Sequence, residues 1–157
     1  MDRIILCIGL LSIFLCQCSS IKVQSISCIS CNNDIIIQYE KENRTAKKEG
    51  RIAEKSLEAF SVTFLNIFND DVEGYINNKL VFKDRVISNE VTGKSSATFG
   101  YNYSNDQDIP ILKVSISNSD DCFDIPINLE YKLIYVFRTT DHNWIVRYSN
   151  IYYLNDG

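Results

Sequence analysis

Several residue types on which catalytic and nucleic-acid-binding proteins depend are scarce in this chain of 157 residues. It has one histidine, His142, and the sequence shows no Ser–His–Asp or Cys–His arrangement for nucleophilic catalysis. Its formal net charge of -4 gives no basic excess of the kind that nucleic-acid-binding domains carry. Two prolines and six glycines stand against 45% hydrophobic residues, which excludes collagen-like and disordered chains and predicts one folded domain.

The first twenty residues are typical of an export signal. An apolar run of twelve residues, 4–15, follows the positive charge of Arg3 and precedes small and polar residues. A membrane-spanning helix needs about twenty apolar residues, so this run is too short to cross a bilayer. Its length matches the apolar part of a cleavable signal peptide, which we expect to occupy residues 1–20.

A lipoprotein signal is the alternative interpretation of the same segment. Cys18, followed by two serines, resembles the lipid-modified cysteine of a bacterial lipoprotein, and Leu15 fits the position three residues before it. Cys16 and Gln17 depart from the small side chains that the motif requires there. Both interpretations predict an extracytoplasmic protein, either secreted or held at a membrane surface by a lipid anchor.

Cleavage after Cys18 would leave three cysteines, Cys28, Cys31 and Cys122. In an oxidising compartment two of them would pair and one would remain, and the sequence does not identify the pair. Cys28 and Cys31 form a C-x-x-C motif, but no strand pattern precedes it, as a redox site of this kind requires. A zinc site would need Cys122 and His142 as well, at a spacing typical of no common module. We expect a structural disulfide or inert thiols, and no metal.

The rest of the chain divides into a polar linker, residues 21–43, and a folded domain, residues 44–157. Apolar residues early in this domain recur at spacings of three and four, which predicts an amphipathic helix over residues 51–69. These residues are Ala53, Leu57, Phe60, Phe64 and Ile67. A short helix is expected over residues 71–77, with Asn69 and the two aspartates after it as its cap.

Strands are expected in the C-terminal half, which is rich in β-branched and aromatic residues. They are placed at residues 80–82, 95–103, 111–116, 127–139 and 144–154. The last two form a hairpin with His142 in its turn, and residues 127–139 should lie centrally because both faces are apolar. The acidic stretch around Cys122, with Asp120, Asp121 and Asp124, is interpreted as a solvated turn, with calcium binding as the alternative. The expected fold class is α+β, a long N-terminal helix packed on a curved antiparallel sheet.

Two parts of the sequence resemble nuclear-transport-factor-2-like domains. Residues 59–65, 68–76 and 80–84 are similar to the opening of these domains, a long helix, a short helix and a first strand with a V-F-x-D motif. Residues 131–137 and 143–146 are similar to their closing hairpin, in which a tryptophan begins the last strand. The resemblance covers residues 51–154 and implies a cone, in which the sheet wraps against the long helix and leaves a pocket at its open end.

The resemblance also implies which residues would line that pocket. Enzymes of this family place Asp, His or Tyr inside the cone, and the aspartate of V-F-x-D corresponds to Asp84. Tyr131 and Tyr135 are candidates to face the pocket as hydrogen-bond donors. No second pocket acid is identified, and His142 falls in a turn, so these residues give only a sparse catalytic set.

The favoured interpretation is an exported, non-catalytic binding domain for a protein partner or a small apolar ligand. It requires no cofactor and no nucleic acid, and it touches a membrane only through a lipid anchor. One alternative is a small lyase or isomerase that uses Asp84 with Tyr131. Another is a structural or assembly component that forms a homodimer through its sheet.

Overall fold

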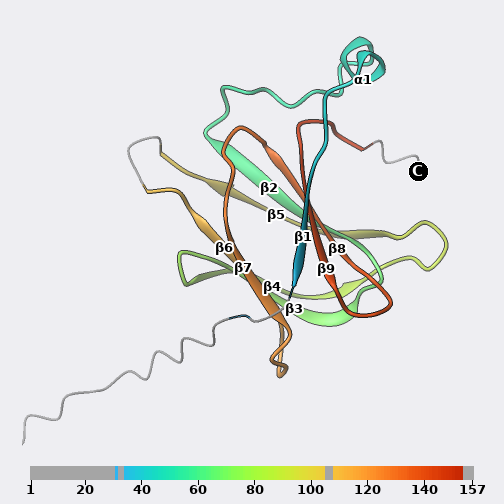
Figure 1. Ribbon diagram of the computed structural model, residues 1–157, viewed down its shortest axis with the longest axis vertical. Coiled ribbons are helices and arrows are strands. Elements are labelled where there is room, and N and C mark those ends of the chain that lie inside the picture. Colours follow the sequence, from blue (N-terminus) through green and yellow to red (C-terminus); the bar gives the residue numbers. More distant parts are fainter. Residues whose placement is uncertain (1–30, 32–33, 105–107, 154–157) are drawn as a thin grey trace, which may run out of the picture.

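The computed structural model describes Cys31, residues 34–104 and residues 108–153. Within these residues the chain forms nine strands and one helix of five residues (Figure 1). In chain order the elements are β1 (Ile35–Tyr39), α1 (Arg44–Lys48), β2 (Ala59–Asn66), β3 (Asn69–Ile76), β4 (Lys79–Ile87), β5 (Lys94–Asn102), β6 (Ile111–Ile116), β7 (Cys122–Pro126), β8 (Leu133–Arg138) and β9 (Trp144–Ser149). The predicted signal peptide, with Cys18, and also Cys28 lie outside the described residues. Among the described residues, no helix has the length and apolar character needed to cross a membrane.

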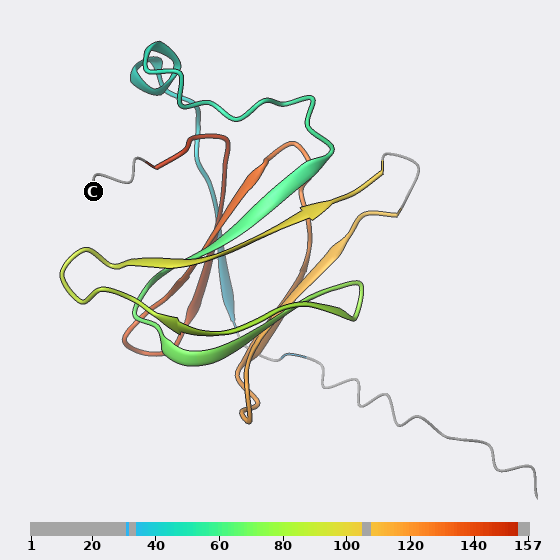
Figure 2. The same ribbon diagram turned by 180° about the vertical axis from the view of Figure 1, so that it is seen from behind.

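The strands form two sheets that pack face to face (Figures 1 and 2). The large sheet has five strands in the order β1-β9-β8-β2-β5, and the small sheet has four in the order β4-β3-β6-β7. β1 pairs with β9, and β2 with β8, in parallel, whereas the other strand pairs are antiparallel. Residues 88–93 carry the chain from β4 at the edge of the small sheet to β5 at the edge of the large one.

One apolar core fills the space between the sheets, and alternate residues of the strands build it. In β2, Phe60, Val62 and Phe64 are buried, and the residues between them face outward. Such a period of two gives a strand one apolar face. Other buried members of the core are Val72, Ile76, Leu112, Val114, Phe123, Ile125, Ile134, Val136, Trp144, Val146 and Tyr148.

The predicted helix over residues 51–69 is wrong, because this stretch holds an irregular segment followed by β2. Phe60 and Phe64 satisfy both periods, since a spacing of four residues returns to the same face of a helix and of a strand. Val62 decides between them: it is fully buried beside the two phenylalanines, whereas in a helix it would lie on the opposite face. Leu57, another member of the expected helical stripe, is exposed.

The predicted short helix over residues 71–77 is also wrong, since these residues belong largely to strand β3. Val72, Gly74 and Ile76 face the core, and Glu73 and Tyr75 between them face outward. Gly74 makes room for an aromatic ring, because a Cβ there would stand 3.0 Å from two ring atoms of Phe99. The expected α+β cone is therefore wrong, and the described chain is a β-sandwich without a long helix.

The C-terminal hairpin is confirmed. β8 pairs antiparallel with β9, with Arg138 opposite Trp144, and the exposed His142 lies between them with a positive φ of 61°. β8 is the middle strand of the large sheet and is buried on both faces over most of its length, as its apolar pattern predicts. The other three expected strands correspond to β4, β5 and β6.

Two strands go beyond what the sequence predicts. β1 lies within residues 21–43, interpreted as a linker, where three consecutive isoleucines define neither a helical nor a strand period. β7 begins at Cys122, in the acidic stretch that we expected to be a turn. Both are edge strands of five residues, and so short a segment shows too few alternations of apolar and polar residues to predict a strand.

A buried arginine joins the two sheets. Arg138 of β8 is only 7% exposed and forms ion pairs with Asp70 of β3 and with Asp121, just before β7. The indole N–H of Trp144 donates to Asp121 at 2.6 Å, and the Arg138 guanidinium lies 5.5 Å from the centre of the indole ring. Two carboxylates and an aromatic face therefore compensate the burial of this cation.

A disulfide ties the two sheets along the side away from β4 and β5. It joins Cys31, which precedes edge strand β1, to Cys122, the first residue of edge strand β7. The two Cα atoms are 5.2 Å apart, although the residues are 91 positions apart in the sequence. This bond identifies the pair that the sequence left open.

Replacing both Cys31 and Cys122 by serine is expected to lower the free energy of unfolding by about 2–4 kcal/mol, because the bond restricts the unfolded chain. Denaturant unfolding followed by Trp144 fluorescence measures the loss. Cys28→Ser is the matched control, and its unfolding midpoint should equal that of the parent chain. An equal loss in Cys28→Ser would contradict the pairing.

Arg138→Met is expected to lower the free energy of unfolding by about 3 kcal/mol, because it leaves the partly buried Asp121 and Asp70 without their cation. The control is Arg85→Met, which removes an exposed pair with Asp71 at 3.5 Å and should cost less than about 1 kcal/mol. Thermal and denaturant unfolding of both variants give the comparison. Equal losses would show that the buried pairs stabilise no more than the surface pair does.

Candidate functional site

The outer face of the large sheet carries two cross-strand rows of side chains. Both are fixed by the strand register, because residues opposite each other in a pleated sheet project from the same face. The polar row runs through Gln38, Arg147, Tyr135, Thr63 and Thr98. The apolar row runs through Ile36, Ile145, Phe137 and Leu65 and ends at Lys94.

Two chain segments cross this face and form what we name the C-terminal wall, residues 51–53 and 150–153. Ile52 and Ile151 form an isolated antiparallel bridge, and backbone hydrogen bonds lie on either side of it, from Ala53 to Asn150 at 2.7 Å and from Tyr152 to Arg51 at 2.9 Å. The Tyr135 hydroxyl donates to the Ile151 carbonyl at 3.0 Å and so fastens the wall to the sheet.

The β4–β5 loop, residues 88–93, stands on the other side of the rows and is named the loop wall. Asn89 holds its tip, because its side-chain oxygen accepts from the backbone N–H groups of Val91 and Thr92, both at 2.9 Å. Gly93 has a φ of 67° and accepts from Asn66 N at 2.6 Å. A Cβ at this position would stand 2.6 Å from Asn66 Oδ1, so the loop packs against β2 only with glycine here.

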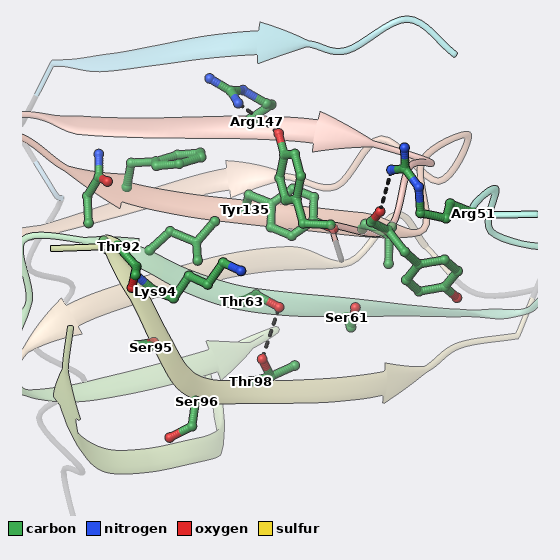
Figure 3. Close-up of a pocket in the computed structure, with 17 residues that line it drawn as sticks. Arg51, Ser61, Thr63, Thr92, Lys94, Ser95, Ser96, Thr98, Tyr135 and Arg147 are labelled. Atoms are coloured by element: carbon green, nitrogen blue, oxygen red, sulfur yellow. Dashed lines mark hydrogen bonds between the residues drawn. The ribbon is translucent and has the colours of Figure 1, made fainter. Parts of the chain in front are cut away.

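Between the two walls lies a recess of about 800 Å³, which we name the outer-face cleft (Figure 3). Such a volume is in the range of small-molecule sites. Its lining combines aliphatic, aromatic, hydroxyl and cationic side chains. The residues are Arg51, Ser61, Thr63, Leu65, Asn66, Thr92, Gly93, Lys94, Ser95, Ser96, Thr98, Leu133, Tyr135, Phe137, Arg147, Tyr152 and Tyr153.

Hydroxyl groups occupy the floor of the cleft next to Tyr135. Thr63 and Thr98 lie opposite each other on β2 and β5, and their hydroxyl oxygens are 3.0 Å apart. Ser61 precedes them on the outward face of β2. Each hydroxyl group can donate one hydrogen bond and accept others, so a pair joined to each other still has capacity for a ligand.

The cations of the cleft differ in how they are compensated. Arg51 is paired with Glu49, with nitrogen–oxygen distances of 2.6 and 2.7 Å. Arg147 instead donates to the neutral Gln38 at 3.0 Å and to the Tyr153 hydroxyl at 2.8 Å, and its guanidinium lies 4.8 Å from the centre of the Phe137 ring. These three contacts fix the plane of the guanidinium without a carboxylate.

The residues that the sequence suggested as catalytic do not come together. Asp84 is exposed on β4 of the small sheet, where its carboxylate accepts from the backbone N–H of Arg85 at 2.8 Å. Tyr131 lies just before β8, with its ring against Tyr39 and Tyr148. Tyr135 alone of the three lines the cleft, where its hydroxyl serves the C-terminal wall.

The other charged positions that the sequence singled out lie at three places in the described structure. In the described part of the chain, no group of three or more His, Cys, Asp or Glu residues is placed to hold a metal ion. Asp121 is bound to Arg138 and Trp144, Asp124 is exposed on β7, and His142 is exposed in the β8–β9 turn.

Lys132 is buried as Arg138 is, and it belongs to the framework of the fold. It is 6% exposed, and its Nζ donates to the Tyr103 hydroxyl at 2.7 Å and to the Leu129 carbonyl at 2.9 Å. The Tyr103 hydroxyl in turn donates to the Leu57 carbonyl at 3.2 Å. This chain of bonds joins the segments that precede β2 and β8 and follow β5.

Sequence reasoning missed most of the cleft, above all Arg147. The signal for this residue was present, because the apolar residues Trp144, Val146 and Tyr148 occupy alternate positions of the last strand and so place Arg147 on its other face. The partners of Arg147 were not predictable from the sequence, because Gln38, Phe137 and Tyr153 come from three other parts of the chain.

Tyr135 should ionise late in an alkaline titration, because burial raises its pKa from the ordinary 10.0 to about 12. Folded chains then retain a proton that unfolded chains lose, so this contribution to stability is complete below pH 10 and disappears as the pH rises through about 12. Absorbance of tyrosinate in the parent chain minus that in Tyr135→Phe isolates the step. A difference curve with its midpoint at pH 10 would contradict the burial.

Comparison of the chain with protein-family models, with curated proteins and with solved structures finds no match.

Proposed function

We propose that this chain is an exported, non-catalytic binding domain that holds a small ligand, or the end of a larger one, in the outer-face cleft. The observation that carries the proposal is the construction of the cleft. Its floor is a hydrogen-bonded sheet in which β2, β8 and β9 each pair on both sides, and its walls are fastened to that floor through Tyr135 and Gly93. A recess that is formed before the ligand arrives loses little conformational entropy on binding.

The outer face of the small sheet shows the contrast. There the charges compensate one another across β3 and β4, with Lys83 on Glu73 at 2.7 Å and Arg85 on Asp71 at 3.5 Å. Such pairs suit a face that meets water. The outer-face cleft instead has a cation without a carboxylate beside aromatic and hydroxyl groups, which favours recognition of a ligand.

Export is supported by two independent observations. Residues 1–20 have the length and pattern of a cleavable signal peptide. The Cys31–Cys122 disulfide is the second, because structural disulfides persist in oxidising compartments outside the cytosol.

The proposal is tested by ligand-observed NMR with a library of small polar and aromatic compounds. Thr63→Tyr puts a bulky side chain on the cleft floor, and compounds that bind the parent chain are expected to lose most of their signal with this variant. Ser115→Tyr, at an outward position of the small sheet, is the matched control and should bind them unchanged. Binding that survives Thr63→Tyr would contradict the cleft as the site.

A further inference from the structure

We propose that the ligand of the outer-face cleft is an acidic saccharide, a sugar whose carboxylate or sulfate group pairs with Arg147 while its hydroxyl groups bond to the polar row. This inference rests on the proposed function and names the chemical class of its ligand. The charge, the hydrogen-bonding groups and the aromatic rings of the cleft each favour this class of ligand.

The charge of the cleft is opposite in sign to that of the chain. The chain has 20 acidic residues against 16 basic ones, yet within the described ranges no acidic residue lines the cleft. Arg147 forms no ion pair with any residue in the described ranges, and its N–H groups beyond those given to Gln38 and Tyr153 have no acceptor there. A planar guanidinium held in one orientation suits a two-oxygen anion such as a carboxylate or a sulfate.

The hydroxyl groups favour a ligand that is itself rich in hydroxyls. The polar row continues from Arg147 through Tyr135 to Thr63 and Thr98, a distance of about 14 Å at ~4.8 Å per strand. In Figure 3, Lys94 extends over the floor toward Thr63. Donors and acceptors at several points along such a length match a short saccharide and exceed the reach of a single small anion.

Aromatic rings supply the remaining part of a sugar site. Phe137 lies in the floor, and Tyr152 and Tyr153 in the C-terminal wall are 45% and 39% exposed. The face of an aromatic ring carries partial negative charge, so it attracts the C–H groups that a pyranose ring presents on its faces. These rings can pack against a sugar without competing for its hydroxyl groups.

An acidic peptide fits this floor less well. Extended peptides bind to sheets chiefly through the unpaired backbone groups of an edge strand. The cleft floor is built on β2, β5 and β8, with Arg147 from β9, and of these strands only β5 is an edge strand. Away from the β5 edge the floor offers side chains alone, which suits a ligand recognised through its hydroxyl and anionic groups.

The test uses matched trisaccharide and disaccharide probes with the chain purified in its disulfide-bonded form. The probes are 3′-sialyllactose for the carboxylate, lactose 3′-sulfate for the sulfate, and lactose as the neutral control, with sodium acetate and sodium sulfate as free anions. Backbone amide shifts in ¹H–¹⁵N NMR give both affinity and location. We expect at least one acidic sugar to shift Thr63, Thr98 and Arg147 and to bind about tenfold more tightly than lactose.

Variants of Arg147 test the pairing directly. Arg147→Gln should weaken binding of the acidic sugar about tenfold and leave the affinity for lactose unchanged. Arg147→Lys should retain part of the preference for the acidic sugar, because lysine keeps the positive charge but lacks the two parallel N–H donors of a guanidinium. Arg85→Gln, on the small sheet, is the control and should bind as the parent chain does.

Each other outcome overturns the inference in a distinct way. Equal affinity for lactose and the acidic sugars would show that the cleft does not recognise the anionic group. Equal affinity for free sulfate or acetate would show that it does not recognise the sugar. If an acidic peptide binds at the cleft and no sugar does, the ligand class is a peptide and not a saccharide, while the proposed binding function stands. Shifts confined to residues outside the cleft would contradict the proposed function as well.

Discussion

Trp144 places an indole N–H and two ring faces at one point between the sheets, and the arrangement of both sheets depends on it. The side chain is fully buried, contacts Phe123 of the small sheet and donates to Asp121, which Arg138 also holds. Because side chains alternate along a strand, burying Trp144 commits Arg147, three positions later, to the outer face. The same contact that closes the core therefore sets the cation of the cleft in place.

The sequence predicts the C-terminal hairpin well and the N-terminal part of the domain badly, for one physical reason. Residues 127–139 are apolar on both faces and rich in β-branched and aromatic residues, which favours a central strand, whereas Phe60 and Phe64 are four residues apart and satisfy both periods. Only Val62, which is buried between the two phenylalanines, distinguishes the strand period from the helical one. The aromatic and β-branched residues around it in β2 also favour a strand. The opening part of the resemblance to cone-shaped domains includes those ambiguous positions, and the long helix of the expected fold class was placed on them.

The cleft is less predictable than the fold, because its residues meet only through register. Tyr135 was identified as a candidate on β8, but the role expected for it, a donor to a ligand in a cone, is replaced by a bond to Ile151. Thr63 and Thr98 face each other across β2 and β5, 35 positions apart in the chain. Parallel pairing of β2 with β8 then brings Tyr135 beside Thr63, and no local pattern reveals such a crossing.

The parallel pairing of β1 with β9 makes the first strand of the fold depend on the last. A chain that is synthesised, or passes through a secretion channel, from its N-terminus keeps β1 without its neighbour until nearly every other element has emerged. Throughout this interval, the three consecutive isoleucines of β1 form an unpaired apolar segment with high β-propensity, which is prone to aggregation. Completion of the sandwich is thus a late, long-range event, which slows folding and leaves the newly made chain open to self-association until the C-terminal strand arrives.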